Sequence, residues 1–305
     1  MIAGADSIDD MAILRHGGMG RVFDAAYAPS TLGSFLREFT FGHVRQLDAV
    51  ASRVLGNLAA ATPVLDGIDG DVLIDTDDSI IEVHGYAKQG AGFGYSGVRG
   101  INALLGTITV AGRAPVIAAS RLRKGSTSSV RGAARLVADT LATVRRLRSR
   151  TATGRVLLRA DSAFYAHTVV HAAITAAAQV SITIRQDKRV KAAIATIGVA
   201  AWTKIKYTDA IFDEDTARWI SAAEVAEIPF TAFTSRRKDQ QVPGRLVVRR
   251  IPDLNPKTTD GQTTLFDIWR FHAFFTTTPD VEADTVTADQ VCNCSDYLAG
   301  SVHAI

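Results

Sequence analysis

Apolar side chains recur with a helical period in the first sixty residues. They follow one another every three or four positions from Leu32 to Leu58, which is the spacing of one face of an α-helix. The dipeptide Thr62-Pro63 and the glycine-containing residues 66–70 then interrupt the pattern, as a turn would. We therefore expect a helical N-terminal segment over residues 1–65.

Beyond residue 70 the pattern changes to short apolar runs, which are typical of strands. Two segments with helical spacing, residues 126–148 and 166–178, lie among them. Strands that first follow one another and then alternate with helices predict an α/β (α+β) fold, a mixed sheet with flanking helices. The ribonuclease-H-like fold has this order, and other α/β folds share parts of it. The runs occupy residues 72–74, 80–83, 104–110, 115–118, 155–159 and 180–184.

The last third of the chain is rich in strand and turn patterns. Residues 201–265 read as a β-rich insertion, and residues 268–275 return to a strong strand pattern. We therefore divide the rest of the chain into four parts. They are a first part of the mixed-sheet domain (66–200), the insertion (201–265), a return strand of that domain (266–290) and an aberrant tail (291–305).

Composition narrows the class of protein. The chain has 305 residues, of which 47% are hydrophobic and 21% charged, enough for one large or two ordinary domains. No apolar run approaches the ~18 residues of a membrane span, and the N-terminus lacks the pattern of a secretory signal. Cys292 and Cys294 are poorly spaced for a disulfide, and no second pair completes a zinc site. We expect a cytoplasmic protein without membrane contact.

Charge is segregated along the chain although the net charge is only +3. Between Arg121 and Arg159 there are eleven Arg or Lys and a single acid, Asp139. Such a segment can bind a polyanion such as DNA. A helix with a solvated arginine face explains the charge pattern equally well.

Acidic residues follow two of the predicted strands. Asp75 and Asp77 come directly after residues 72–74, and alternate residues of a strand share a face. Such carboxylates repel unless a cation neutralises them, and Mg²⁺ or Mn²⁺ prefers oxygen ligands. Asp161 follows the strand at 155–159, where ligands of α/β sheets gather. The alternatives are a solvated acidic turn for the first group and a helix cap for Asp161.

Several blocks, in order, resemble the DDE transposases of bacterial insertion sequences. The resemblance extends from about residue 2 to residue 290 and is strongest to the actinobacterial branch with a β-rich insertion. The first catalytic block is matched by residues 73–79 (LIDTDDS), 82–90 (EVHGYAKQG) and 94–97 (GYSG), and the second by residues 158–165 (LRADSAFY). Further matches are residues 213–215 (DED), 222–227 (AAEVAE), 232–234 (AFT) and 269–275 (WRFHAFF).

The resemblance implies a ribonuclease-H-like catalytic domain and names its site. The first catalytic Asp of the family is followed two places later by Ser or Thr, which selects Asp77, with Ser79 behind it, over Asp75. Asp161 is the second. The family uses Mg²⁺ or Mn²⁺, for which Asp77, Asp161 and Asp75 are the expected ligands, to cut and join DNA strands. The DNA backbone would be held by basic residues between the blocks, namely Lys88, Arg121, Arg123, Lys124 and Arg131.

The third catalytic carboxylate of the family, a Glu, has no counterpart. Residues 286–290 pass directly into a tail with no helical period and no glutamate. Glu282 and Asp289 are nearby acids that we interpret as solvated loop residues. We therefore expect a truncated or frameshifted copy, from which an upstream DNA-binding segment is also missing.

Three functions follow as alternatives. The first is a DDE transposase, made inactive by the missing acid, that binds insertion-sequence ends and target DNA at the nucleoid. The second is a non-catalytic DNA-binding remnant. The third is a metal-dependent nuclease that uses Asp75, Asp77 and Asp161 as a complete set. Self-association is an open expectation for each.

Overall fold

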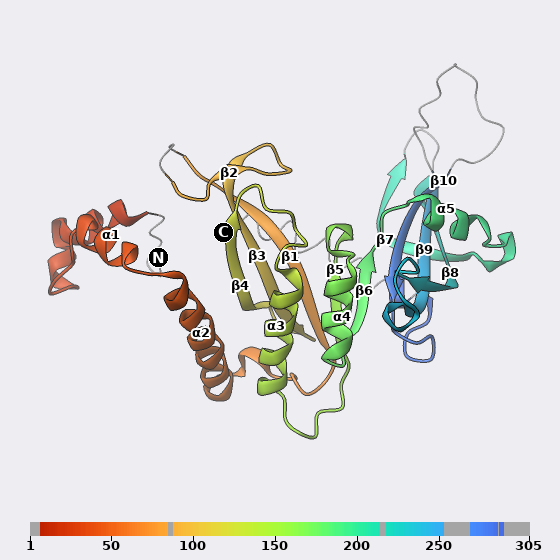
Figure 1. The fold of residues 1–305 in the computed structure, drawn as a ribbon, viewed down its shortest axis with the longest axis horizontal. Helices are drawn as coiled ribbons and strands as arrows, with labels where there is room; N and C mark the ends of the chain where they lie inside the picture. The colour runs from red at the N-terminus through yellow and green to blue at the C-terminus, as the bar shows by residue number, and fades with distance from the viewer. Residues whose placement is uncertain (1–6, 85–87, 214–217, 253–268, 286, 290–305) are drawn as a thin grey trace, which may run out of the picture. The chain divides into compact units, whose positions relative to one another are not determined.

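The computed structural model describes residues 7–84, 88–213, 218–252, 269–285 and 287–289. It divides into two compact units, residues 1–55 and 56–305, whose relative placement is undetermined (Figure 1). The described part of the N-terminal segment is helical, as its apolar pattern predicts, with α1 (Pro29–Arg37) and α2 (Phe41–Ala61). It also contains three 3₁₀ helices, Ile8–Arg15, Gly17–Arg21 and Pro63–Leu65. Pro29 opens α1 at its first turn, where the missing N–H of proline costs nothing.

The second unit is built on one mixed sheet of ten strands. Its strand order is β2-β3-β1-β5-β6-β10-β9-β8-β7, with β4 paired to β3. The first five strands are β1 (Val72–Glu82), β2 (Gly92–Phe93), β3 (Arg99–Val110), β4 (Val116–Lys124) and β5 (Val156–Ala160). The others are β6 (Gln179–Thr183), β7 (Thr203–Asp213), β8 (Arg218–Ala232), β9 (Val242–Pro252) and β10 (Trp269–Thr276).

The predicted ribonuclease-H-like fold is confirmed by the pairing of the first strands. β1 runs antiparallel to β3, and β3 antiparallel to β4. On the other side β1 is parallel to β5, and β5 is parallel to β6. The carboxyl ends of β1, β5 and β6 therefore point to one edge of the sheet. The strands of the β-rich segment continue the same sheet, since β10 pairs with both β6 and β9.

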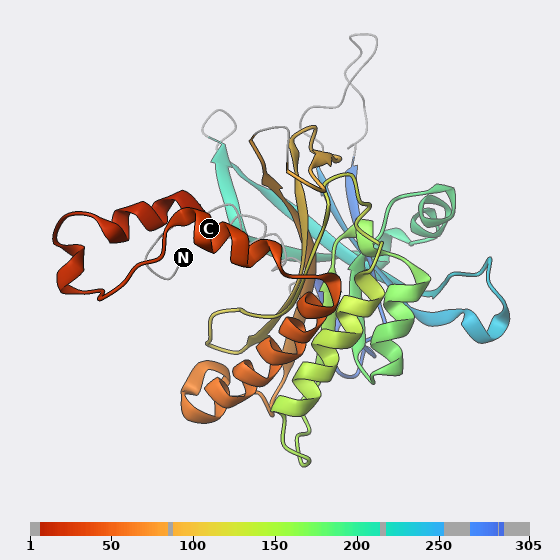
Figure 2. The same ribbon diagram turned by 60° about the vertical axis from the view of Figure 1, so that its left-hand side comes forward.

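Helices α3 (Ala133–Leu147) and α4 (His167–Thr175) lie side by side on one face of the sheet, and α5 (Lys188–Ala195) follows β6 (Figure 2). The apolar face of α3 packs on β1 and β3, where Ile74, Leu104 and Ile108 are fully buried. Gly106 allows the close approach, since a Cβ there would lie 2.3 Å from Oγ1 of Thr140. No described helix is both long and apolar enough to cross a membrane.

Three predicted elements differ from the structure. The strand runs predicted at 72–74 and 80–83 form one strand, β1, because cross-strand partners neutralise its acidic middle. The helix predicted from residue 126 begins only at Ala133, after Gly132 in a left-handed conformation (φ 83°). The strand predicted at 115–118 extends to Lys124, so Arg121, Arg123 and Lys124 belong to β4.

Candidate active site

Asp77 and Asp161 meet at the carboxyl edge of the parallel strands. In the register of β1 and β5, Thr76 pairs with Ala160, so Asp77 and Asp161 each stand one residue beyond that pair. Both carboxylates are exposed and line the same cleft, whose volume is about 1160 Å³. The sheet therefore brings together two acids that are 84 residues apart in the sequence.

The surroundings of the two carboxyls make their ionisation costly. The protein around the cleft displaces water from Asp77, and with the charges of Asp161, Asp78 and Asp75 this raises its pKa to about 6. Desolvation and the charge of Asp78 likewise raise the pKa of Asp161. Hydrogen bonds only partly oppose these effects, since Asp77 Oδ1 accepts from the Asp78 N–H at 2.7 Å. A cation between the carboxylates would relieve the repulsion.

Asp161 also caps the turn that follows it. Its Oδ1 accepts a hydrogen bond from the N–H of Ala163 at 2.9 Å, at the start of the 3₁₀ helix Ser162–Phe164. Capping uses one lone pair of a carboxylate that has about four. Capping and metal binding, which were alternatives from the sequence, are therefore compatible.

The other acids of β1 are committed elsewhere. Asp75 forms a two-pronged pair with Arg159, at 2.7 Å from Nε to Oδ1 and 2.9 Å from Nη2 to Oδ2, and both residues are buried. Asp78 accepts hydrogen bonds from Arg123, Asn102 and Ser129. Asp78 also lines the cleft, but it is buried and bonded to these donors, so Asp77 is the exposed acid of residues 75–78 beside Asp161.

A comparison with known protein families identifies the class of protein. The family described as "Transposase DDE domain group 1" matches residues 1–257. This chain belongs to that transposase family. A search of curated proteins found no match.

A DDE transposase takes its name from three acids, and the described part of this one offers two. Among the described residues, no three His, Cys, Asp or Glu side chains form a group that could hold a metal. Asp187 also lines the cleft, but its Oδ1 accepts from the N–H groups of Arg189 and Val190 and caps α5. Residues 290–305 lie outside the described residues.

The two nearby acids that we interpreted as solvated loop residues differ from each other. Glu282 is exposed. Asp289 is 2% exposed and lies 3.7 Å from Nη1 of Arg249, so that interpretation was wrong for Asp289.

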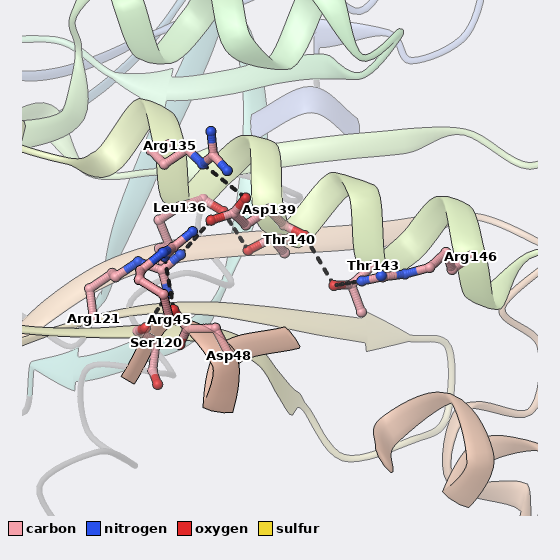
Figure 3. A network of polar contacts seen from close by, with 10 residues as sticks. All are labelled: Arg45, Asp48, Ser120, Arg121, Arg135, Leu136, Asp139, Thr140, Thr143 and Arg146. Carbon is pink, nitrogen blue, oxygen red and sulfur yellow. Dashed lines mark hydrogen bonds and ion pairs between the residues drawn. The ribbon is translucent and has the colours of Figure 1, made fainter. Parts of the chain in front are cut away.

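The basic residues predicted to hold DNA fall into two classes. Lys88, Lys124 and Arg131 have exposed side chains. Arg121 is paired with Asp139, which also binds Arg135 at 3.1 Å (Figure 3). Arg123 is largely buried, with 10% of its side chain exposed, and contacts only protein groups in the described structure. Three of the five predicted cations are therefore exposed, and no ion pair joins them to another described residue.

Sequence reasoning missed two cations that line the cleft, Arg185 and Arg189. The side chain of Arg189 donates to the backbone carbonyl of Thr231. Arg185 is exposed just after β6, lines the cleft with Asp161, and its positive charge lowers the pKa of that acid. No hydrogen bond or ion pair joins its side chain to another described residue. The available signal was its place after the third parallel strand, the position by which Asp77 and Asp161 were found.

Proposed function

We propose that Asp77 and Asp161 form the part that this chain retains of a transposase centre for cutting and joining DNA strands. The observation that carries the proposal is the pair itself: two exposed carboxylates on adjacent parallel strands, with the pKa of Asp77 raised to about 6. A structural acid pair would be expected to have cationic partners, as Asp75 and Asp78 have. Asp77 and Asp161 instead face a cleft large enough for a nucleotide strand.

The donor set fits Mg²⁺ or Mn²⁺. Both ligands are carboxylate oxygens, which hard divalent cations prefer. When bound, such an ion would supply Lewis-acid chemistry to the phosphodiester, favouring attack of a hydroxyl and departure of the leaving oxygen. Asp77 and Asp161 hold the ion in this proposal, while Lys124, Arg131 and Arg185 hold backbone phosphates. Asp75 is left out of the ligand set because its carboxylate is committed to Arg159.

Strand transfer by this site is proposed to be weak or absent. Positioning by a full ligand set supplies much of the catalysis in metal-dependent phosphoryl transfer. With only two carboxylates in the described centre, the ion would be held loosely. The same observation supports the second candidate, a non-catalytic protein that binds DNA at the nucleoid. The nuclease alternative loses support, since it needs Asp75 as its third ligand.

Titration with Mn²⁺, followed by electron paramagnetic resonance, tests the proposal on the full chain. We expect one weakly bound ion, and no binding in Asp77→Asn or Asp161→Ala. Asp187→Asn is the matched control, because it removes a carboxylate from the same cleft while asparagine still caps the helix. Two tightly held ions would favour the nuclease, and none would favour the DNA-binding remnant.

A nicking assay on supercoiled plasmid tests the chemistry. Any Mg²⁺-dependent nicking by the purified protein should disappear in Asp161→Ala. Nicking that is unchanged in this variant would refute the assigned centre, since no other described acid replaces Asp161 beside Asp77. Self-association of the chain stays a prediction, for which sedimentation of the purified protein is the direct measurement.

A further inference from the structure

A buried polar cluster lies directly behind the catalytic carboxylates. We call it the Arg123 cluster: Arg123, Asp78, Asn102 and Ser129. Arg123 donates to Asp78 Oδ2 at 2.8 Å and to Asn102 Oδ1 at 2.8 Å. Asn102 and Ser129 donate to the same carboxylate, at 2.5 Å to Oδ2 and 2.9 Å to Oδ1. Asp78 and Asn102 are buried, so three strands and a loop share one satisfied network.

The cluster fixes one end of the loop that forms a wall of the cleft. Nη1 of Arg123 donates to the backbone carbonyl of Ser129 at 3.0 Å, and also to those of Ser128 and Arg131. Ser126 and Ser128, on the same loop, are exposed and line the cleft with Asp77 and Asp161. Arg123 thus holds the backbone of the loop whose serine residues line the cleft.

The other end of the loop is fixed by backbone packing. Gly125 lies so close to its neighbours that a Cβ there would be 2.0 Å from the carbonyl oxygen of Gly100 and 2.4 Å from that of Gly92. Its N–H donates to the carbonyl of Gly90 at 3.0 Å. The loop is therefore held at one end by the backbone around Gly125 and at the other by the hydrogen bonds of Arg123.

The same cluster reaches Asp77 through its neighbour in the chain. Asp78 is the next residue of β1, and its backbone N–H donates to Asp77 Oδ1 at 2.7 Å. Fixing the Asp78 side chain therefore fixes the peptide that orients the Asp77 carboxylate. Arg123 also neutralises Asp78, which would otherwise add a third uncompensated charge beside Asp77 and Asp161.

We propose that Arg123 is a positioning residue, which holds Asp77 and the Ser126–Ser128 loop in the geometry that binds the metal ion and the DNA strand. The proposal rests on the function proposed above and gives Arg123 a role inside the protein in place of the phosphate contact expected from the sequence. Arginine is required because its planar fork donates in several fixed directions at once. Lysine keeps the charge and loses the fork.

The test compares Arg123→Lys with Arg121→Lys in the full chain. Arg121 is the matched control, since it lies two residues away on the same face of β4 and is also ion-paired. For Arg123→Lys we expect about tenfold weaker Mn²⁺ affinity, the scale seen when residues behind metal ligands are replaced, and a similar loss of affinity for a duplex oligonucleotide. Arg121→Lys should stay within about twofold of the native chain. Equal behaviour of the two variants would overturn the proposal.

Ser129→Ala supplies a second variant that buries no unpaired charge and should fold even if Arg123→Lys does not. It removes one hydrogen bond to Asp78 from the same loop, and we expect about threefold weaker DNA binding. If the two side chains act on one loop, their effects in the double variant are smaller than the product of the single effects. Independent, multiplicative effects would contradict the inference.

The salt dependence separates positioning from direct phosphate contact. Removing a phosphate contact lowers the slope of log K against log salt by about 0.9, whereas a positioning residue leaves the slope unchanged. The slope is therefore measured in Arg123→Gln, which removes the charge, and a slope lowered by about 0.9 in this variant would refute the positioning role. A native chain that binds neither Mn²⁺ nor DNA would instead refute the proposed function, so the two failures are distinguishable.

Discussion

Replacing Arg159 by methionine would leave Asp75 buried without its main partner. In the native protein 3% of Arg159 and 8% of Asp75 is exposed. The guanidinium binds both carboxylate oxygens, at 2.7 and 2.9 Å. Methionine fills much of the volume of the arginine stem and offers no donor, so the variant isolates the loss of the ion pair from the loss of packing.

The expected loss of stability is large because the Asp75–Arg159 pair is buried away from water. Breaking a buried, hydrogen-bonded pair by removing one partner typically costs about 3–5 kcal/mol, since the remaining charge keeps its desolvation penalty. Each kcal/mol corresponds to roughly 2–4 °C in Tm for a domain of this size. The Arg159→Met variant should therefore melt on the order of 10 °C below the native protein.

Urea denaturation followed by circular dichroism measures this loss as a change in the free energy of unfolding. The matched variant is the double replacement Asp75→Asn with Arg159→Met, which removes both charges and should recover more than half of the loss. A loss below about 1 kcal/mol in Arg159→Met would refute the reasoning, because it would mean that Asp75 has other compensation. The double variant should also bind Mn²⁺ like the native chain. A tenfold loss there would restore Asp75 to the ligand set.

Three further predictions follow from the cleft. Because the pKa of Asp77 is raised to about 6, protons compete with the metal ion at low pH, and Mn²⁺ affinity should be roughly tenfold weaker at pH 5 than at pH 7. Equal affinities at the two pH values in calorimetric titration would contradict this. Gly125→Ala should lower the free energy of unfolding by about 1–3 kcal/mol through backbone overlap, whereas Gly198→Ala, in open space, should have little effect in the same urea assay. Arg185→Ala should lower the salt slope of DNA binding by about 0.9, and an unchanged slope in fluorescence anisotropy would exclude it as a phosphate contact.

The alternation of strands and helices was sufficient to predict the sheet and its acidic edge. Asp161 directly follows β5, as predicted, whereas Asp75 and Asp77 lie within β1 and not after it. The pattern could not decide between Asp75 and Asp77 from the residues alone, since both share a face of β1. The structural difference is Arg159, which pairs with Asp75 in the parallel register. That pairing is between strands 84 residues apart, and no local pattern contains it.

The roles of the basic residues were harder to predict because β4 inverts the usual alternation. Arg121 and Arg123 lie on the face toward α3, while Leu122 between them is 69% exposed. A strand normally buries its apolar positions, so the pattern did not predict that the strand at 115–118 continues through this segment. The inversion arises because Asp139 on α3 and Asp78 on β1 offer buried or half-buried partners. The sequence therefore shows that a segment is basic, but only the acidic partners seen in the structure show which of its charges remain available to DNA.

The charge balance of the cleft bears on how many ions it can hold. Two of the three acids at residues 75–78 are each neutralised by an arginine from another strand of the sheet, Asp75 by Arg159 on β5 and Asp78 by Arg123 on β4. Asp77 and Asp161 then contribute a charge of about −2 when both are ionised, which balances one divalent cation and leaves a second one unpaired. A second ion would need a further carboxylate or the phosphates of bound DNA. We therefore expect the chain to bind one Mn²⁺ weakly in the absence of DNA, and we expect added DNA to raise the affinity for that ion.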